Sequence, residues 1–170
     1  MNTVLARWNV LPDLEAAEEI LPCCGSQRWA HALVRLRPFQ NWETMRVKSD
    51  EVWLALDPAD WDEAFASHPR IGEKKAPDSA TAKSVQWSTQ EQSGVISSGK
   101  DIQERLRHAN AEYEQRFGRI YIVCAAGKSA EQMLAIVKRR LNNDEFEELR
   151  EAAEQQRQIT QLRLRKWLGL

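Results

Sequence analysis

The chain has 170 residues and a formal net charge of −1, with 42% hydrophobic and 29% charged residues. These values are ordinary for a globular protein, and a chain of this length buries roughly two thirds of its unfolded surface without disulfides or metal. The near-neutral charge argues against binding to nucleic-acid phosphates, which needs a marked excess of Lys and Arg on one face. No apolar run approaches the length of a membrane span, so a membrane is not an expected partner. Nucleic acid is not an expected partner either, because of the near-neutral charge.

Cysteine usage indicates a reducing compartment. The three cysteines are odd in number, and Cys23 and Cys24 are neighbours in sequence, where an unstrained disulfide is difficult to form. With Cys124 they are expected to be reduced structural thiols of a cytoplasmic protein. The length fits one domain over residues 1–170, and most of the seven Trp residues are expected in its core.

The first half of the chain alternates apolar and polar residues at helical spacing. Ser26 can cap a helix that Pro38 stops. Asp60 with Glu63 forms a possible capping box for a short helix that ends before Pro69. The expected helices here cover about residues 14–21, 26–36, 42–56 and 60–68.

Residues 68–87 lose this periodicity and are predicted to form a long loop, a kind of segment that is usually functional or disordered. Ser88 and Glu91 then have the spacing of a second capping box, which opens another helix. In the structural interpretation, Ser88 and Glu91 only cap this helix. The functional reading is that a helix N-terminus binds a carboxylate or carbonyl group of a substrate, with Glu91 and Gln92 adding directed hydrogen bonds.

The second half contains one apolar β-branched run, at 120–124, among helices. Since one strand cannot form a sheet, we expect a buried extended segment. Gly118 is the expected C-cap of the helix before it, Ser129 with Gln132 opens the next helix, and Asn143 caps the last. The predicted fold is therefore all-α, a compact single-domain bundle of about eight helices, of which the last three cover about 100–117, 129–141 and 143–167.

The last predicted helix carries an arginine on its apolar face. At about 100° per residue, Arg163 falls within the stripe formed by the apolar residues. A buried guanidinium needs an anionic or carbonyl partner, so Arg163 either forms an internal ion pair or binds a ligand. The stripe consists of Phe146, Leu149, Ala152, Ala153, Ile159 and Leu162.

His68 is a second candidate for chemistry. It stands at a predicted helix end and is followed by Pro69, which restricts its backbone to extended conformations. Histidine is the side chain best suited to exchange a proton near neutral pH. The structural alternative is a histidine that faces water at a helix C-terminus, where the dipole favours its charge.

Other kinds of site have little support. Residues 126–129 resemble the end of a phosphate-binding loop, but the upstream glycine is missing. His31, His68 and His108 have no metal-ligand spacing, and Cys124 lies in an apolar run that predicts an inert thiol. Neither a metal nor a cofactor is therefore expected.

Several motifs follow one another in order over nearly the whole chain. They are Cys23-Cys24-Gly25-Ser26 with Arg28-Trp29, Arg37-Pro38-Phe39, the block 68–73, Ser88-x-x-Glu91-Gln92-x-Gly94, the run 113–118, the runs 122–125 and 127–130, and the tail 148–164. Together these motifs resemble the 2-oxo-4-hydroxy-4-carboxy-5-ureidoimidazoline (OHCU) decarboxylases. Arg119 departs from this pattern, because the family often has a bulky apolar residue there.

The resemblance implies an all-α homodimer that catalyses a cofactor-independent lyase reaction, the decarboxylation of OHCU to (S)-allantoin. This is the last step of urate degradation in purine catabolism. It also implies that His68, Glu91 and Arg163 are catalytic. The implied substrate-binding residues are Pro69, Ser88, Gln92, Ile120, Tyr121, Ile122, Val123, Cys124 and Ala125.

Two alternatives compete with this interpretation. A hydrolase of a ureido or imide compound would need an activated water, typically on a metal, and a chelator would inhibit it. A non-catalytic helical binding module would leave His68 and Arg163 solvated or paired internally, with no pocket between them.

Overall fold

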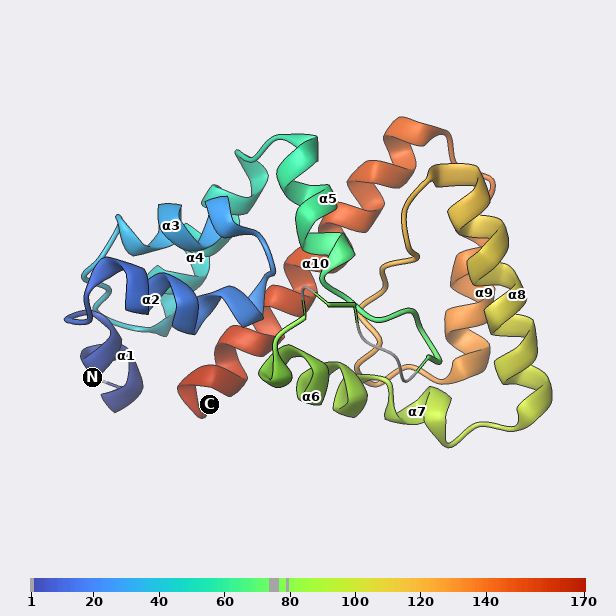
Figure 1. The fold of residues 1–170 in the computed structure, drawn as a ribbon, viewed down its shortest axis with the longest axis horizontal. Coiled ribbons are helices and arrows are strands. Elements are labelled where there is room, and N and C mark those ends of the chain that lie inside the picture. Colours follow the sequence, from blue (N-terminus) through green and yellow to red (C-terminus); the bar gives the residue numbers. More distant parts are fainter. Residues whose placement is uncertain (1, 74–76, 79) are drawn as a thin grey trace. The chain divides into compact units, whose positions relative to one another are not determined.

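The computed structural model describes residues 2–73, 77–78 and 80–170 (Figure 1). These residues contain ten α-helices, one short 3-10 helix and no β-strand, which confirms the all-α prediction. The chain divides into two units by its internal contacts, Met1–Ala64 with Arg157–Leu170 and Phe65–Gln156. Helices α5 (Pro58–Ala66) and α10 (Glu145–Leu168) each run from one unit into the other. The single domain over residues 1–170 stays a prediction.

The first unit is a helical cluster in which α2 packs on α3 and α3 on α4 (Figure 1). Ser26 caps α3 as predicted, because its hydroxyl oxygen accepts a hydrogen bond from the Trp29 backbone N–H at 3.3 Å. The first helix, which the Asn2 side chain caps, was not predicted from the sequence. The elements of this unit, besides parts of α5 and α10, are α1 (Thr3–Trp8), α2 (Asp13–Ile20), η1 (Leu21–Cys23), α3 (Gln27–Val34) and α4 (Trp42–Leu54).

Tryptophan rings occupy the core of the first unit. Trp8 is fully buried, stacks on Phe39 with ring centroids 6.1 Å apart, and meets Trp167 edge-on at 5.7 Å. The Trp8 indole N–H donates to the Ala16 carbonyl at 2.9 Å, so the one polar atom of this ring is satisfied. The prediction that most tryptophans are buried is confirmed, since five of the seven are: Trp8, Trp29, Trp53, Trp87 and Trp167.

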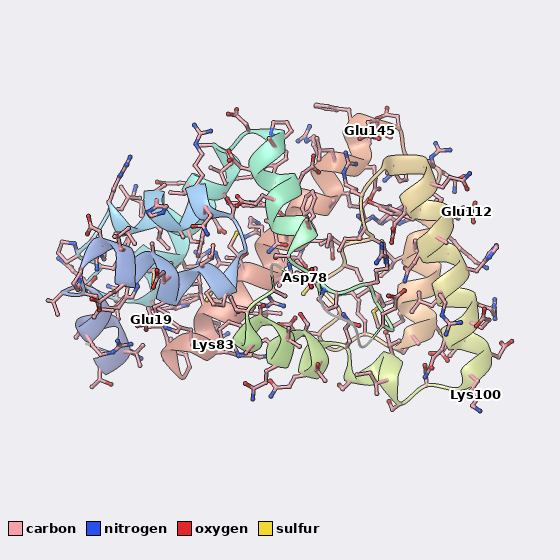
Figure 2. The ribbon with its side chains drawn as sticks, viewed as in Figure 1. Glu19, Asp78, Lys83, Lys100, Glu112 and Glu145 are labelled. Atoms are coloured by element: carbon pink, nitrogen blue, oxygen red, sulfur yellow. The ribbon has the colours of Figure 1, made fainter. Side chains whose placement is uncertain are left out.

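The second unit is built on α8 and α9, which pack side by side and run in the same direction (Figure 1). Helix α8 has the predicted bounds, and Gly118 ends it in the left-handed conformation with φ of 65°. Its polar face is exposed, and Lys100 and Glu112 lie on it (Figure 2). The helices of this unit, besides parts of α5 and α10, are α6 (Ala82–Glu91), α7 (Ser93–Ile96), α8 (Lys100–Phe117) and α9 (Ala130–Arg140).

Two of the predicted caps were wrong. Helix α5 begins at Pro58, and Asp60 lies within its first turn, where its carboxylate accepts from the Asp57 backbone N–H at 3.3 Å. Helix α10 begins one residue later than predicted. Asp144 rather than Asn143 accepts from the Glu147 backbone N–H, at 2.8 Å. Neighbouring residues that can each cap a helix make errors of one to three residues easy.

The apolar stripe predicted on the last helix is correct in its middle and wrong at its start. Ala152, Ala153 and Ile159 are buried, whereas Phe146 is 67% exposed. The Phe146 ring instead lies beneath the Arg150 guanidinium, 5.7 Å from the ring centroid. The predicted loop also ends earlier than expected, because α6 begins at Ala82. Lys74, Lys75, Ala76 and Ser79 of that loop lie outside the described residues.

Candidate functional site

His68 is held in the second unit just after the end of α5. It is 8% exposed, and its backbone N–H donates to the Phe65 carbonyl at 3.1 Å. The imidazole Nε2 lies 2.7 Å from the side-chain oxygen of Gln156, which is fully buried. The alternative of a water-facing histidine at a helix end is therefore wrong. Pro69, which follows it, is buried as well.

Gln92 is the residue between α6 and α7, whereas Ser88 and Glu91 lie at the C-terminal end of α6 and not at a helix N-terminus. Thr81 caps this helix, and Ser88 is a buried residue of its last turns. The predicted capping box of Ser88 and Glu91 is thus wrong, and so is anion binding by free N–H groups at that position. The periodicity of residues 82–87 is too polar to distinguish a helix from a loop.

Gln92 joins the end of α6 to the loop that follows His68. Its side-chain oxygen accepts a hydrogen bond from the Gly72 backbone N–H at 3.0 Å, and Gln92 is 7% exposed. Glu91 beside it is half-buried. This hydrogen bond connects the loop after His68 to the end of α6, and it therefore holds that loop close to Glu91.

The extended segment predicted at 120–124 is non-helical, and its buried part is shifted by one residue, to 121–125. Its backbone groups bond to side chains instead of a neighbouring strand. Arg140 donates to the Ile122 carbonyl at 2.6 Å, and the Cys124 N–H donates to the Gln155 side-chain oxygen at 2.9 Å. Lys128 donates to the Cys124 carbonyl at 2.7 Å. Side chains from α9, from α10 and from the turn before α9 therefore fix the course of this segment.

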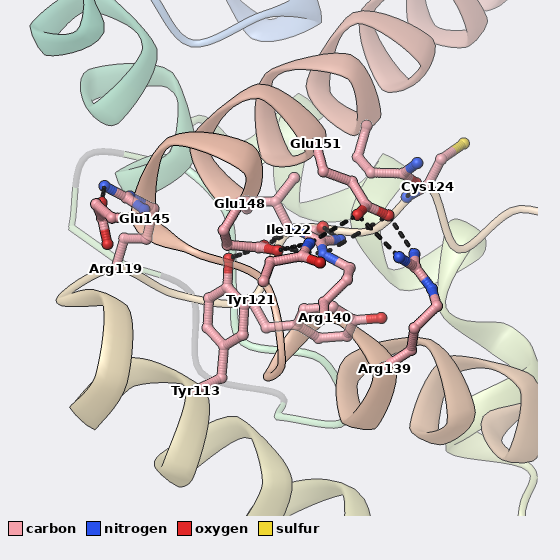
Figure 3. Close-up of polar contacts among 12 residues, drawn as sticks. Tyr113, Arg119, Tyr121, Ile122, Cys124, Arg139, Arg140, Glu145, Glu148 and Glu151 are labelled. Atoms are coloured by element: carbon pink, nitrogen blue, oxygen red, sulfur yellow. Dashed lines mark hydrogen bonds and ion pairs between the residues drawn. The ribbon is translucent and has the colours of Figure 1, made fainter.

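Arg140 is the centre of a buried polar network on that segment (Figure 3). Arg140 and Glu148 are both fully buried and ion-paired, and Tyr113 donates its hydroxyl to the same carboxylate. The Arg140 guanidinium lies 5.0 Å from the Tyr121 ring centroid. Burial opposes the charge of Arg140, but the hydrogen bond to Glu148 raises its pKa above the ordinary value. Burial also raises the pKa of Tyr113, which therefore stays a neutral donor.

Arg119, the departure from the family pattern, is accommodated by an ion pair within the second unit. Its guanidinium donates to Glu145 at 2.5 Å, and the Arg119 side chain is only 14% exposed (Figure 3). The charge at this position thus has a partner on α10, and none of the proposed catalytic residues takes part in that contact.

Gly94 allows α7 to pack closely against the turn after the buried segment, because glycine has no Cβ atom. A Cβ atom there would lie 2.8 Å from the Lys128 backbone carbonyl oxygen, too close for either backbone to remain in place. Lys128 is also the residue that donates to Cys124. Glycine at this position is therefore a packing requirement of the segment, which explains its place in the sequence motif.

Replacing Gly94 by alanine is expected to destabilise the protein by about 1–3 kcal/mol, because a backbone must shift to relieve the contact. Urea denaturation of the variant and the native protein measures this change. Gly99→Ala is the matched control, since nothing lies within 4 Å of an added Cβ there. Because Gly99 is also the N-cap of α8, the control is expected to lose up to about 1 kcal/mol, less than Gly94→Ala. Equal midpoints for both variants would contradict the close approach.

Arg163 lies in the first unit and is 1% exposed, as its place in the stripe predicts. One guanidinium nitrogen donates to the Pro22 carbonyl at 3.3 Å. Cys24 lies close enough for the charge of Arg163 to act on its thiol, and the thiol also hydrogen-bonds with Thr160. The interactions of Arg163 in this unit thus include a hydrogen bond to a backbone carbonyl and a charge interaction with the Cys24 thiol.

Cys24 is expected to be unreactive while the protein is folded. Burial raises the pKa of this thiol to about 12, although the hydrogen bonds and the charge of Arg163 oppose the change. The thiolate fraction at pH 8 is therefore negligible in the folded protein, whereas unfolding restores a pKa of about 8.5. Iodoacetamide labelling at pH 8, read by peptide fragmentation, should modify Cys24 only in denaturant. Rapid labelling of the native protein would refute this.

The predicted site residues thus fall into two groups. His68, Pro69, Ser88, Glu91, Gln92 and residues 120–125 belong to the second unit, and Arg163 belongs to the first. Within the second unit, parts of this group are held by three residues that were not predicted from the sequence: Gln155, Gln156 and Arg140. Gln156 had a detectable signal, since it follows Ala152 by four residues on the buried face of α10.

The described residues hold no group of three or more His, Cys, Asp or Glu side chains arranged to bind a metal ion. Among the same residues, no helix is both long and apolar enough to cross a membrane.

Comparison with protein families matches residues 9–165 to the OHCU decarboxylase family. A relative from Amia calva, 2-oxo-4-hydroxy-4-carboxy-5-ureidoimidazoline decarboxylase, is 30% identical over 75% of this chain and 73% of its own. The uric acid degradation bifunctional protein TTL of Arabidopsis thaliana is 35% identical over 85% of this chain. The chain spans only 44% of the length of that protein.

Two solved structures are similar in fold. One is a crystal structure of OHCU decarboxylase in the presence of (S)-allantoin, with a TM-score of 0.76 and 29% identity over 90% of this chain and 99% of that one. The other is a crystal structure of (S)-allantoin synthase, with a TM-score of 0.72 over 96% of this chain and 53% of that one. At 17% identity, the second shows likeness of fold alone.

Proposed function

Because the chain belongs to the OHCU decarboxylase family, we propose that it converts OHCU to (S)-allantoin and CO2 in urate degradation. The observation that carries this proposal is the family match over residues 9–165, supported by the Amia calva relative of similar extent. A solved relative crystallised in the presence of (S)-allantoin agrees with the product. The binding-module alternative has no such support.

The reaction needs an electron sink and a directed proton. Loss of CO2 leaves an electron pair on the ring carbon that carries the hydroxyl group, and the adjacent ring C=N bond accepts this pair. The nitrogen gains a proton, the hydroxyl loses its proton as it becomes the ring carbonyl, and the neighbouring carbon gains one. Stereoselectivity requires that this last proton arrive on one face only. Positioned hydrogen-bonding groups suffice for such a sequence.

We propose that His68, Glu91 and Arg163 carry out this chemistry. His68 is buried and oriented by Gln156, which suits it to hold the substrate hydroxyl and exchange a proton. Arg163, also buried, offers a planar fork of donors for the ring oxygens. Glu91 accepts hydrogen bonds from the ureido group.

The remaining residues of the proposed site bind substrate through shape and backbone contacts. They are Pro69, Ser88 and Gln92, with the segment 120–125. The N–H and carbonyl of Cys124 already bond to Gln155 and Lys128, so a substrate that bonds to these two atoms must share them. The other backbone groups of the segment are the better candidates for direct contact.

We also propose that the chain works as a homodimer in the cytoplasm. The family resemblance implies the dimer, and the three cysteines, which form no disulfide with one another, suit a reducing compartment. Light scattering after size exclusion should give twice the chain mass of 19.6 kDa. A mass equal to that of one chain would reject the dimer.

Circular dichroism of freshly generated OHCU tests the activity directly. Urate is oxidised and hydrolysed to OHCU, and the signal is followed with and without the protein, in EDTA. Rapid formation of (S)-allantoin alone, above the slow racemic background, is expected. A trace equal to the background would reject the proposal, and activity that EDTA abolishes would favour the metal-dependent hydrolase.

A further inference from the structure

Gln156 is a polar residue in a place that favours an apolar one. It is fully buried and lies on α10 between the buried residues Ala152 and Ile159. A buried amide destabilises the fold unless its polar atoms form hydrogen bonds. Its oxygen lies 2.7 Å from Nε2 of His68, a residue 88 positions earlier in the chain. The partner of this amide is thus the histidine that the proposed function makes catalytic.

The identity of the facing atoms restricts the imidazole. A carbonyl oxygen only accepts hydrogen bonds, so the ring nitrogen that faces it must carry hydrogen. Neutral His68 is then protonated on Nε2. The imidazolium keeps the same bond, because both of its nitrogens carry hydrogen. Any proton that His68 gains or loses while bonded to Gln156 is consequently on Nδ1.

We propose that Gln156 is the positioning residue of His68. Its side-chain oxygen holds the imidazole in the Nε2–H tautomer and directs Nδ1 to the proton exchange. A carboxylate in this place would also favour the charged imidazolium, whereas a neutral amide selects the tautomer without adding charge. The inference rests on the proposed role of His68.

The neighbouring Gln155 positions a different part of the second unit, the buried segment 121–125. Its side-chain oxygen accepts from the Cys124 N–H at 2.9 Å, so consecutive residues of α10 orient two different parts of the second unit. One glutamine fixes an imidazole, and the other fixes the backbone of the buried segment. Both bonds arise from the middle of a 24-residue helix, whose regular backbone limits their movement.

Nitrogen-15 NMR of the imidazole rings tests the proposal without substrate. The chain has three histidines, and loss of one set of signals in His68→Phe assigns those of His68. Two-bond correlations at pH 8 distinguish the Nε2–H from the Nδ1–H tautomer. The native protein is expected to show Nε2–H for His68, and Gln156→Met a mixture of the two tautomers. Gln156→Glu keeps an acceptor oxygen and should retain Nε2–H.

Kinetics of the same variants provide the second measurement. Gln156→Met is expected to lower kcat at least about tenfold with little change in KM, the scale of a lost partner behind a functional histidine. Gln158→Met is the matched control on the same helix and should leave both the spectrum and kcat unchanged. The Nδ1–H tautomer in the native protein would overturn the proposal, as would Gln156→Met with native spectrum and kcat. Native Nε2–H without any OHCU turnover would support the positioning and reject the proposed function instead.

Discussion

Replacing His68 by alanine is expected to lower kcat by at least about 100-fold, the usual scale for a positioned acid–base group. The variant loses the imidazole that would hold the substrate hydroxyl and exchange the proton. It also removes the N–H that faces the Gln156 oxygen at 2.7 Å, so a destabilisation of about 1–3 kcal/mol should accompany the kinetic loss. Turnover followed by circular dichroism, at a temperature where both proteins are folded, measures the first effect.

His108→Ala is the matched control for this experiment. His108 lies on the exposed face of α8, and its replacement should change neither kcat nor the thermal midpoint. A folded His68→Ala protein with near-native turnover would remove His68 from the catalytic residues. It would leave the family membership intact, because that rests on the match over residues 9–165.

Local hydrogen-bond patterns account for the parts of the fold that the sequence predicts well. Gly118 takes the left-handed conformation that ends α8, and Ser129 with Gln132 forms the reciprocal capping box of α9. Each feature needs only residues within four positions of one another. Ser88 and Glu91 have the same spacing, yet lie near the end of a helix. A spacing alone does not distinguish a cap from two polar residues in consecutive turns.

In the candidate site, too, local features are predicted from the sequence and contacts between distant residues are not. Helical spacing placed Arg163 on the buried face, and the structure confirms its burial. The bond between His68 and Gln156 joins residues 88 positions apart, so no local pattern predicts it. A buried glutamine on an apolar face can be recognised from the sequence as unusual, but its partner cannot.

Arg140 was missed for a related reason. It stands in the last turn of α9 beside Lys138 and Arg139, where basic residues are expected to face water and interact with the helix dipole. Arg139 does so and pairs with Glu151 at the surface. Arg140 turns inward and is fully buried. The difference lies in the segment 121–125, whose Ile122 carbonyl has no neighbouring strand and bonds to Arg140 instead.

Replacing Arg140 by methionine is therefore expected to destabilise the protein by about 3–5 kcal/mol, the scale for breaking a buried ion pair. The variant leaves the Glu148 carboxylate buried, with hydrogen bonds from Tyr113 and Asn143 but without its ion-pair partner, and it deprives the Ile122 carbonyl of its donor. Urea denaturation at neutral pH, followed by tryptophan fluorescence and circular dichroism, measures the loss. Arg139→Met is the control, since that exposed pair should contribute at most about 1 kcal/mol.

A double variant separates the ion pair from the support of the segment. Arg140→Met with Glu148→Leu removes both charges, so it should be more stable than Arg140→Met alone, because no unpaired carboxylate remains. The Ile122 carbonyl still lacks its donor in the double variant, and turnover should stay reduced even where stability recovers. Equal stability of the single and double variants would show that the carboxylate finds other partners. Native turnover in a folded double variant would show that the segment keeps its course without Arg140.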